Sequence, residues 1–190
     1  MTNVLLISEN FLRSNFSISD NVQSKYLLSA IRQAQTFNFQ QVVGTKLYEK
    51  LQDLVATNGF TENDPYKELL DKAQLFIGYA AIAELCVIVN VKIDNIGLNF
   101  TSDENVEVLG ISDMFQLQKY YIDKADYYKN ILQRFILKNV SKYPEIMPNE
   151  IQEIYSNLYS AASCGVNLGG ARGKESPFNR YTRYFGYDKP

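Results

Sequence analysis

LFIGYAAIAELCVIV, residues 75–89, is the most apolar stretch of the chain, and Glu84 is its only charged residue. The run is shorter than the roughly 20 apolar residues that a membrane-spanning helix needs, so we expect a buried helix at the centre of a helical domain. Asp64-Pro65 supplies a capping acceptor followed by proline at the first helical position, which predicts a helix over 65–91. Because a lone buried carboxylate costs several kcal/mol, we expect Glu84 to be paired or to face a subunit interface.

A second long helix is predicted over 113–139. Polar residues back an apolar stripe at helical spacing, made up of Met114, Leu117, Tyr121, Ala125, Tyr128, Leu132 and Phe135. The two long helices have similar lengths and are joined by about 20 residues, which predicts an antiparallel pair.

Shorter helices are predicted over 21–37, from the break at Gly44 to about 57, and over 150–162. In the helix over 21–37, the residues expected to be buried are Leu27, Ala30, Ile31 and Ala34. In the helix that follows Gly44, they are Leu47, Leu51, Leu54 and Val55. Three predicted helix starts place an acceptor three residues before glutamine, at Asp20 and Gln23, Asp113 and Gln116, and Asn149 and Gln152. The expected fold class is therefore all-α, a helical bundle.

The connection between the long helices alternates apolar and polar residues in NIGLNFT (95–101) and VEVL (106–109), on either side of the turn-forming SDEN (102–105). This pattern predicts a small projecting β-hairpin. Two strands are marginal alone, so we expect a neighbouring subunit to support it. The alternative is an irregular loop folded onto the body. The apolar residues expected at the subunit interface are Ile96, Leu98, Phe100, Val106 and Val108.

The sequence contains no histidine, the commonest general base and metal ligand. It has no glycine-rich phosphate loop and no nucleophile elbow. Asp103, Glu104 and Glu107 lack the alternating spacing of a calcium loop, and Cys86 and Cys164 fit no ligand spacing. We therefore expect a protein that is not an enzyme and needs no cofactor or metal, with its cysteines reduced in an intracellular compartment.

The last segment, RGKESPFNRYTRYFGYDKP (172–190), carries a charge of +3, which leaves −5 for residues 1–171. Glycines at 165, 169, 170 and 173 precede or open it and predict an extended, flexible arm. A basic arm on an acidic body suggests docking to a partner. The expected partner-binding residues are Arg172, Lys174, Phe178, Arg180, Tyr181, Arg183, Tyr184, Phe185 and Tyr187.

Three parts are expected along the chain: a helical domain at 1–146 with the 95–109 hairpin inserted, a short helix at 147–163 and an extended docking tail at 164–190.

Several elements follow one another in a recognisable order over residues 10–146. An opening helix ends in Ala-Gln, and a Gly-x-x-Leu-Tyr step at Gly44, Leu47 and Tyr48 follows it. A long apolar helix and a glycine-containing hairpin come next, and then a tyrosine-rich helix that ends in the corner Tyr143-Pro144-Glu145. This order resembles the head–tail connector (adaptor, or head-completion) proteins of tailed bacteriophages, with greatest similarity to the connector ring proteins of crAss-like Bacteroides phages. The resemblance does not extend to the tail.

The resemblance implies a structural subunit of the virion, assembled in the host cytoplasm and located at the head–tail junction. It implies a ring, commonly of twelve copies, that joins the portal to adjacent tail or connector rings. DNA would pass through the ring without specific binding and without a membrane being involved. The acidic body suits such a channel, since each neutralised phosphate adds affinity.

Two alternatives remain open. Aromatic and basic residues interleaved in the tail can stack on bases, which favours a nucleic-acid-binding module. An interaction or scaffold protein outside phages is the other. The fourteen tyrosines, with their apolar faces and polar tips, suit any protein that makes extensive contacts, a connector included.

Overall fold

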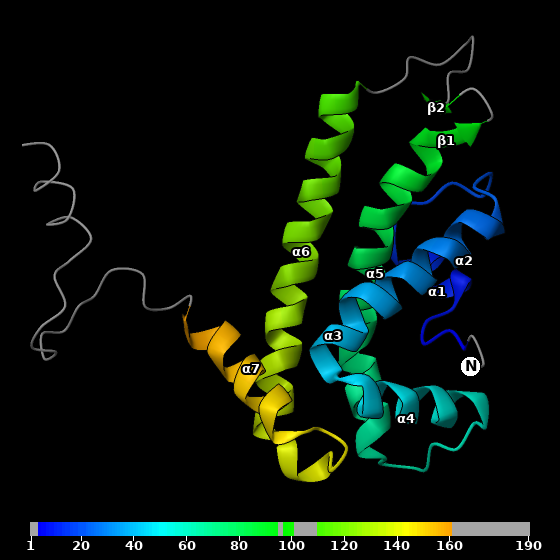
Figure 1. Cartoon of the computed structure of the whole chain (residues 1–190). Helices are drawn as coiled ribbons and strands as arrows, with labels where there is room; N and C mark the ends of the chain where they lie inside the picture. Colours follow the sequence, from blue (N-terminus) through cyan, green and yellow to red (C-terminus); the bar gives the residue numbers. More distant parts are fainter. Residues whose placement is uncertain (1–3, 95–96, 101–109, 161–190) are drawn as a thin grey trace, which may run out of the picture. The chain divides into compact units, whose positions relative to one another are not determined.

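The computed structural model describes residues 4–94, 97–100 and 110–160, and this part of the chain is mostly helical (Figure 1). The all-α expectation is confirmed at this level. The chain divides into two compact units, residues 1–158 and 159–190.

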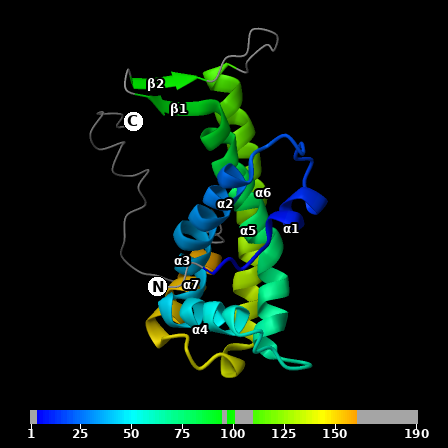
Figure 2. The same cartoon turned by 90° about the vertical axis from the view of Figure 1, so that its right-hand side faces the viewer.

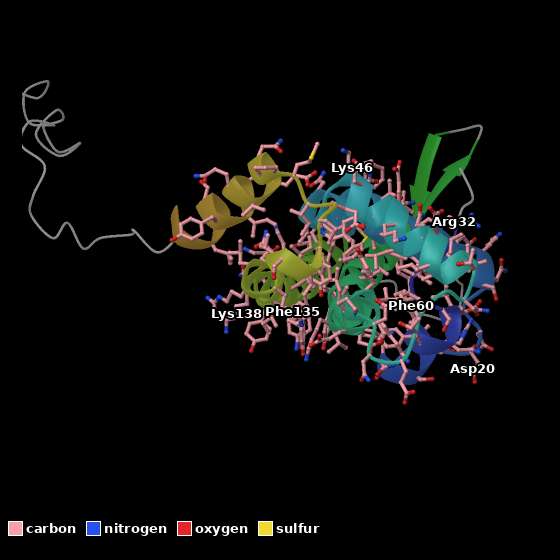
Figure 3. All side chains as sticks on the ribbon, turned by 90° about the horizontal axis from the view of Figure 1, so that it is seen from below. Asp20, Arg32, Lys46, Phe60, Phe135 and Lys138 are labelled. Carbon is pink, nitrogen blue, oxygen red and sulfur yellow. The ribbon has the colours of Figure 1, made fainter. Side chains whose placement is uncertain are left out.

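The longest helices are α5 (Pro65–Asn90) and α6 (Ile111–Lys138), which lie side by side in both views (Figures 1 and 2). Asp64 caps α5 by accepting a hydrogen bond from the Tyr66 N–H at 2.9 Å. Tyr79 of α5 stacks on Tyr128 of α6, with ring centroids 5.3 Å apart. Side chains fill the space between these helices when they are viewed end-on (Figure 3).

Buried side chains occur on nearly all sides of α5, including Leu69, Ala73, Ile77 and Ala81, which are fully buried. By length and composition alone α5 could cross a membrane, and half of its most apolar window is buried inside the helical unit. A core helix has the same composition, because it too must be apolar all round.

The N-terminal segment contains a short helix that the sequence did not predict, α1 (Glu9–Asn15). Seven residues are marginal as an isolated helix, so local contacts must stabilise it. Ser8 accepts a hydrogen bond from the Phe11 N–H, and Arg13 pairs with Glu9 at 2.8 Å. Phe16, just after α1, packs against Gly78 of α5, where a Cβ would meet its ring.

The helix expected over 21–37 begins later and runs further, as α2 (Ser24–Gln33), the π-helix η1 (Ala34–Phe39) and α3 (Gln40–Val43). Its expected buried residues are confirmed, since Leu27, Ala30, Ile31 and Ala34 are all fully buried. Helix α2 begins later than expected because of Arg13. The Arg13 guanidinium donates hydrogen bonds to the carbonyls of Ser19 and Val22, which holds residues 19–22 in a turn.

Gly44 ends α3 with φ 81°, in the left-handed region, and α4 (Thr45–Ala56) follows it. The break was expected, and Leu47 and Leu51 of α4 are fully buried, whereas Leu54 and Val55 are half-buried. Helix α4 lies at the end of the α5–α6 pair opposite to the strands (Figures 1 and 2).

Strands β1 (Val91–Asp94) and β2 (Gly97–Phe100) pair antiparallel directly after α5. The sequence predicted a different hairpin, in which 95–101 is the first strand and pairs with 106–109. The described partner of 97–100 is 91–94, which β-branched Val91 and Ile93 favour. Residues 106–109, the expected second strand, lie outside the described part of the chain.

After α6, the 3₁₀-helix η2 (Val140–Lys142) leads to a corner and then to α7 (Pro148–Ser160). Glu150 of α7 accepts a hydrogen bond from the Met147 N–H at 2.7 Å. Its carboxylate lies against Gly44, where a Cβ would meet it. Glycine is therefore favoured at this position chiefly by its backbone conformation, since the end of the flexible Glu150 side chain could move away from an added Cβ.

The three glutamine-containing caps were wrong. The N-cap of α2 is Gln23, with no side-chain hydrogen bond, and that of α6 is Gly110, three residues before the expected cap Asp113. Asp113 lies inside the first turn of α6, and Asn149 lies inside the first turn of α7. Helix α7 begins one residue before Asn149, at Pro148, whose ring already fixes a helical φ. Of the four starts, only Asp64-Pro65 is confirmed.

Candidate functional site

Helix α6 carries apolar side chains that the described fold leaves exposed. Of its expected buried stripe, Met114, Ala125 and Leu132 are buried, but Leu117 is exposed. The exposed large apolar residues of α6 are Ile111, Phe115, Leu117, Tyr120, Ile122, Tyr127 and Ile131. Exposed apolar residues that gather on one side of a helix are candidates for an interaction site.

These residues form two groups, one on each side of the buried stripe. Ile111, Phe115 and Ile122 are spaced by four and seven residues, and we call them the first flank. Tyr120, Tyr127 and Ile131 are spaced by seven and four residues, and with Leu117 they form the second flank. Since an α-helix turns about 100° per residue, the two groups point in different directions. Helix α6 can thus contact a different surface with each flank.

A tyrosine cluster joins the second flank to the core. The ring of Tyr127, which is 63% exposed, meets the ring of Tyr128 edge-on at 5.3 Å, and Tyr128 stacks on the half-buried Tyr79. The ammonium group of Lys124 lies 4.8 Å from the centroid of the Tyr120 ring and 5.7 Å from that of Tyr79. The pKa of Lys124 is raised, chiefly by its hydrogen bond to Tyr120. The cluster packs the exposed rings of Tyr120 and Tyr127 against neighbouring side chains, and aromatic residues are enriched among those that dominate binding at interfaces.

A groove with a volume of about 220 Å³ lies beside the first flank. Its floor is α5, at Phe76, Ala80 and Ala83, whose small alanine side chains leave the space open. One wall is η1 and α3, and the other is α6, to which Ile122 contributes. The apolar surface of the groove is therefore adjacent to that of the first flank.

Charged side chains in the groove are mainly acidic. Glu84 from α5, Asp126 from α6 and Glu153 from α7 line it, with Lys129 as the basic residue. Lys129 lies 3.5 Å from Asp126. A second hollow of about 570 Å³ shares Gln41, Val42, Gln133 and Glu153 with the groove and adds Glu150. We call the two together the acidic groove.

Glu84 is half-buried and opens into this groove. Within the described part of the chain, no hydrogen bond or ion pair involves its carboxylate. Burial raises the pKa of Glu84, because the charged form loses hydration without gaining a partner. The first alternative that the sequence suggested for Glu84, an internal partner, is thus not found among the described residues, and an interface remains a prediction.

Another tyrosine pair holds the long helices together at the far end from the strands. Tyr143 is buried, and its hydroxyl donates to the Pro65 carbonyl at 3.0 Å. Tyr66 meets the Tyr143 ring edge-on at 5.7 Å and donates its hydroxyl to Glu145. The corner Tyr143-Pro144-Glu145, which is part of the resemblance to connector proteins, therefore connects the segment after α6 to the start of α5.

Gln35, the second residue of the Ala-Gln pair, is a buried polar residue in η1. Its side-chain oxygen accepts from the Leu6 N–H at 3.1 Å, and its side-chain nitrogen donates to the Val4 carbonyl at 2.9 Å. The Gln35 side chain thus provides hydrogen-bond partners for backbone groups of the non-helical segment at residues 4–6. Its role is structural.

Among the residues that the structure describes, no cluster of three or more Asp, Glu, Cys or His side chains could hold a metal ion. The arrangement of the acidic groove and the α6 flanks suits binding to an apolar and basic partner.

The predicted site residues are only partly described. All of the predicted arm residues, from Arg172 to Tyr187, lie outside the described residues, as do Ile96, Val106 and Val108. Leu98 and Phe100 lie on β2, opposite Ile93 and Val91. Sequence reasoning missed the α6 flanks and the acidic groove. A signal for the first flank existed in the spacing of Ile111, Phe115 and Ile122, which is helical but outside the stripe.

A family model matches residues 39–156, which contain α4, α5, α6, most of α7 and nearly all of the acidic groove. No curated protein and no solved structure matches the chain. Because the match covers more than half of the chain, the protein belongs to DUF6712, a family of unknown function.

Proposed function

We propose that this protein is a structural subunit of a phage virion, a head–tail connector ring protein that joins the portal to the tail and surrounds the DNA channel. The observation that carries the proposal is the pair of exposed apolar flanks on α6. The order of elements that resembles connector proteins supports the same reading.

Two different flanks on one helix suit a ring. In a ring, each subunit presents one surface to the neighbour on one side and a different surface to the neighbour on the other. The first flank, with Phe115 at 54% exposure, and the second flank, with Tyr127 at 63%, are two such surfaces. Aromatic residues are favoured at interfaces because they bury much area for little lost side-chain freedom.

In this proposal, α5 and α6 act as an antiparallel frame, with the hairpin projecting from one end and the C-terminal arm extended. The contact of Tyr143, after α6, with Pro65, at the start of α5, supports the antiparallel frame. The hairpin, through residues such as Leu98 and Phe100, would contact a neighbouring subunit or ring. The arm would dock on the portal, an adjacent ring or an adjacent copy.

The charge balance supports a channel through which DNA moves. Residues 1–171 carry a net charge of −5, so the body adds no general attraction for phosphates. DNA would then pass through the ring without specific binding. Twelve copies, assembly in the host cytoplasm and the absence of enzymatic activity are parts of the same proposal.

A nucleic-acid-binding module is the second candidate, favoured by one described feature besides the tail. Tyr120 and Tyr127 are exposed beside Lys124, and exposed aromatic rings next to a lysine can stack on bases. A scaffold protein outside phages would use the same surfaces without a portal.

The proposal is tested by expressing the chain with a candidate portal and imaging the complex by negative-stain electron microscopy. A ring coaxial with the portal is expected. Tyr127→Lys with Ile131→Lys should reduce incorporation, whereas Asp123→Lys, on an exposed part of the same helix, should not. A complex with oligonucleotides that dissociates at high salt, with no binding to the portal, would favour the second candidate.

A further inference from the structure

We infer that the acidic groove receives the C-terminal arm, residues 172–190, of a neighbouring copy of this chain. The inference deepens the proposed function by naming the partner of one surface, and it rests on that function only in assuming that copies associate. The described residues that carry it are the apolar floor, the four acids and the first flank of α6.

Charge complementarity identifies the occupant. The acidic groove contains Glu84, Asp126, Glu150 and Glu153 against Lys129, a net charge of −3. The arm carries five basic and two acidic residues, a net charge of +3. Arginine is suited to such a surface, because its planar guanidinium can bind a carboxylate with two hydrogen bonds.

The shape of the groove matches the apolar residues of the same arm. Ala80 and Ala83 leave open floor above α5, and Ile122 connects this floor to Phe115 and Ile111 on the first flank. An arm with aromatic residues between its arginines can place rings on this apolar surface while its guanidinium groups reach the acids at the rim.

Glu84 points to an occupant that is absent from the described fold. A half-buried carboxylate with no partner among the described residues destabilises the folded chain, and burial raises its pKa. An arginine from another copy would supply the missing partner. Residues of this kind, which lower stability in the isolated protein, are often retained for binding.

The chain is long enough to reach a neighbour. Glu150 and Glu153 of α7 line the acidic groove, and α7 continues from there to Ser160. Eleven residues, 161–171, separate Ser160 from the arm, and an extended chain spans up to about 3.3–3.6 Å per residue. That reach is close to the length of α6, about 1.5 Å for each of its 28 residues. An arm that binds a different surface on the next copy gives the head-to-tail contact from which rings form.

Two full-length variants with reversed charges test the inference. The groove variant carries Asp126→Lys and Glu153→Lys, and the arm variant carries Arg180→Glu and Arg183→Glu. The wild-type chain should self-associate in sedimentation velocity and native mass spectrometry, and each variant alone should associate at least about tenfold more weakly. Their equimolar mixture should regain association, because each arm then meets a groove of opposite charge.

Asp123→Lys is the matched control, since it reverses an exposed acid three residues before Asp126 on the same helix and should leave association unchanged. Glu84→Gln should weaken association about tenfold while leaving the helical circular dichroism intact. Circular dichroism of all variants separates lost association from lost folding.

A wild-type chain that stays monomeric at high concentration would overturn the inference, whether its arm is free or binds its own groove. So would variants that associate normally, or a mixture that fails to regain association. The proposed function would fail separately, if the chain did not join the portal complex. A monomeric protein that still joins that complex would overturn the inference and leave the proposed function standing.

Discussion

Tyr66 and Glu145 are 79 residues apart in sequence, and the Tyr66 hydroxyl lies 2.8 Å and 2.9 Å from the two carboxylate oxygens of Glu145. Beside this contact, Tyr143 donates to the Pro65 carbonyl. The two hydrogen bonds connect the first turn of α5 with the corner after α6. They fix the register of the long helices at one end, which in turn fixes where the acidic groove and the α6 flanks lie.

Tyr66→Phe should lower the free energy of unfolding by about 1–2 kcal/mol, because a hydrogen bond to a charged group is lost. Urea denaturation monitored by circular dichroism measures the change. Tyr127→Phe is the control, since Tyr127 is exposed and its hydroxyl has no hydrogen bond among the described contacts. An equal loss in both variants would contradict the role given to Tyr66.

The protein should lose stability as the pH rises above 10. Burial raises the pKa of both Tyr66 and Tyr143 from 10.0 to about 12, with the Glu145 hydrogen bond adding to the effect at Tyr66. Between these values the unfolded chain releases the protons and the folded chain keeps them, so the free energy of unfolding falls with rising pH. Tyr66→Phe should make this fall less steep in urea titrations between pH 9 and 11. An unchanged slope would show that other groups cause the alkaline loss.

Gln35→Leu should destabilise the protein by about 2 kcal/mol, because the Leu6 N–H and the Val4 carbonyl lose a buried partner. The carbonyl keeps only a longer contact with Gln52, at 3.4 Å. Hydrogen exchange should show faster exchange at Leu6. Gln33→Leu is the control, because among the described residues the Gln33 amide bonds only to Ser29 of the same helix. It should have a smaller effect on unfolding and none on Leu6.

Gly44→Ala should cost about 1–3 kcal/mol from the backbone alone, because φ 81° with ψ 160° is a conformation that essentially only glycine adopts. The added Cβ would also displace the Glu150 carboxylate from its hydrogen bond with Met147. Glu150→Ala removes that hydrogen bond without backbone strain, so it should cost less. Chemical denaturation of both variants and of the double variant gives the comparison. In the double variant the added Cβ no longer meets the Glu150 carboxylate. If the double variant loses about as much free energy of unfolding as Gly44→Ala, the backbone conformation accounts for the cost.

Glu84→Gln should stabilise the isolated protein at neutral pH and have little effect below pH 4. Burial raises the pKa of Glu84 above 4.5, so the free energy of unfolding falls as the pH rises from 4.5 through the folded pKa, and glutamine abolishes this loss. The charged groups that line the groove around it are Asp126 and Lys129 from α6 and Glu153 from α7, while η1 and α3 contribute uncharged Asn38 and Gln41. Thermal unfolding of wild type and variant from pH 4 to 8 checks the sign, and a variant that is less stable at pH 7 would mean that Glu84 has a favourable partner.

The sequence by itself determined where the long helices begin and end to within about two residues. The Asp64-Pro65 signal and the apolar run from Leu75 to Val89 depend on local chemistry, and so does the break at Gly44, where the backbone needs glycine. These features act over a few residues, so they can be read from the chain alone. The start of α2 could not, because Arg13 takes up the carbonyls of Ser19 and Val22.

Only the tertiary structure decided which apolar residues of α6 are buried and which are exposed. Leu117 lies in the same sequence pattern as Leu132, yet Leu132 packs in the core and Leu117 is exposed. The acidic groove likewise combines Glu84, Asp126 and Glu153 from three helices that are distant in sequence. The reason is physical: helical periodicity fixes the direction of each side chain around its own axis, but the packing of neighbouring helices fixes which of those directions is covered.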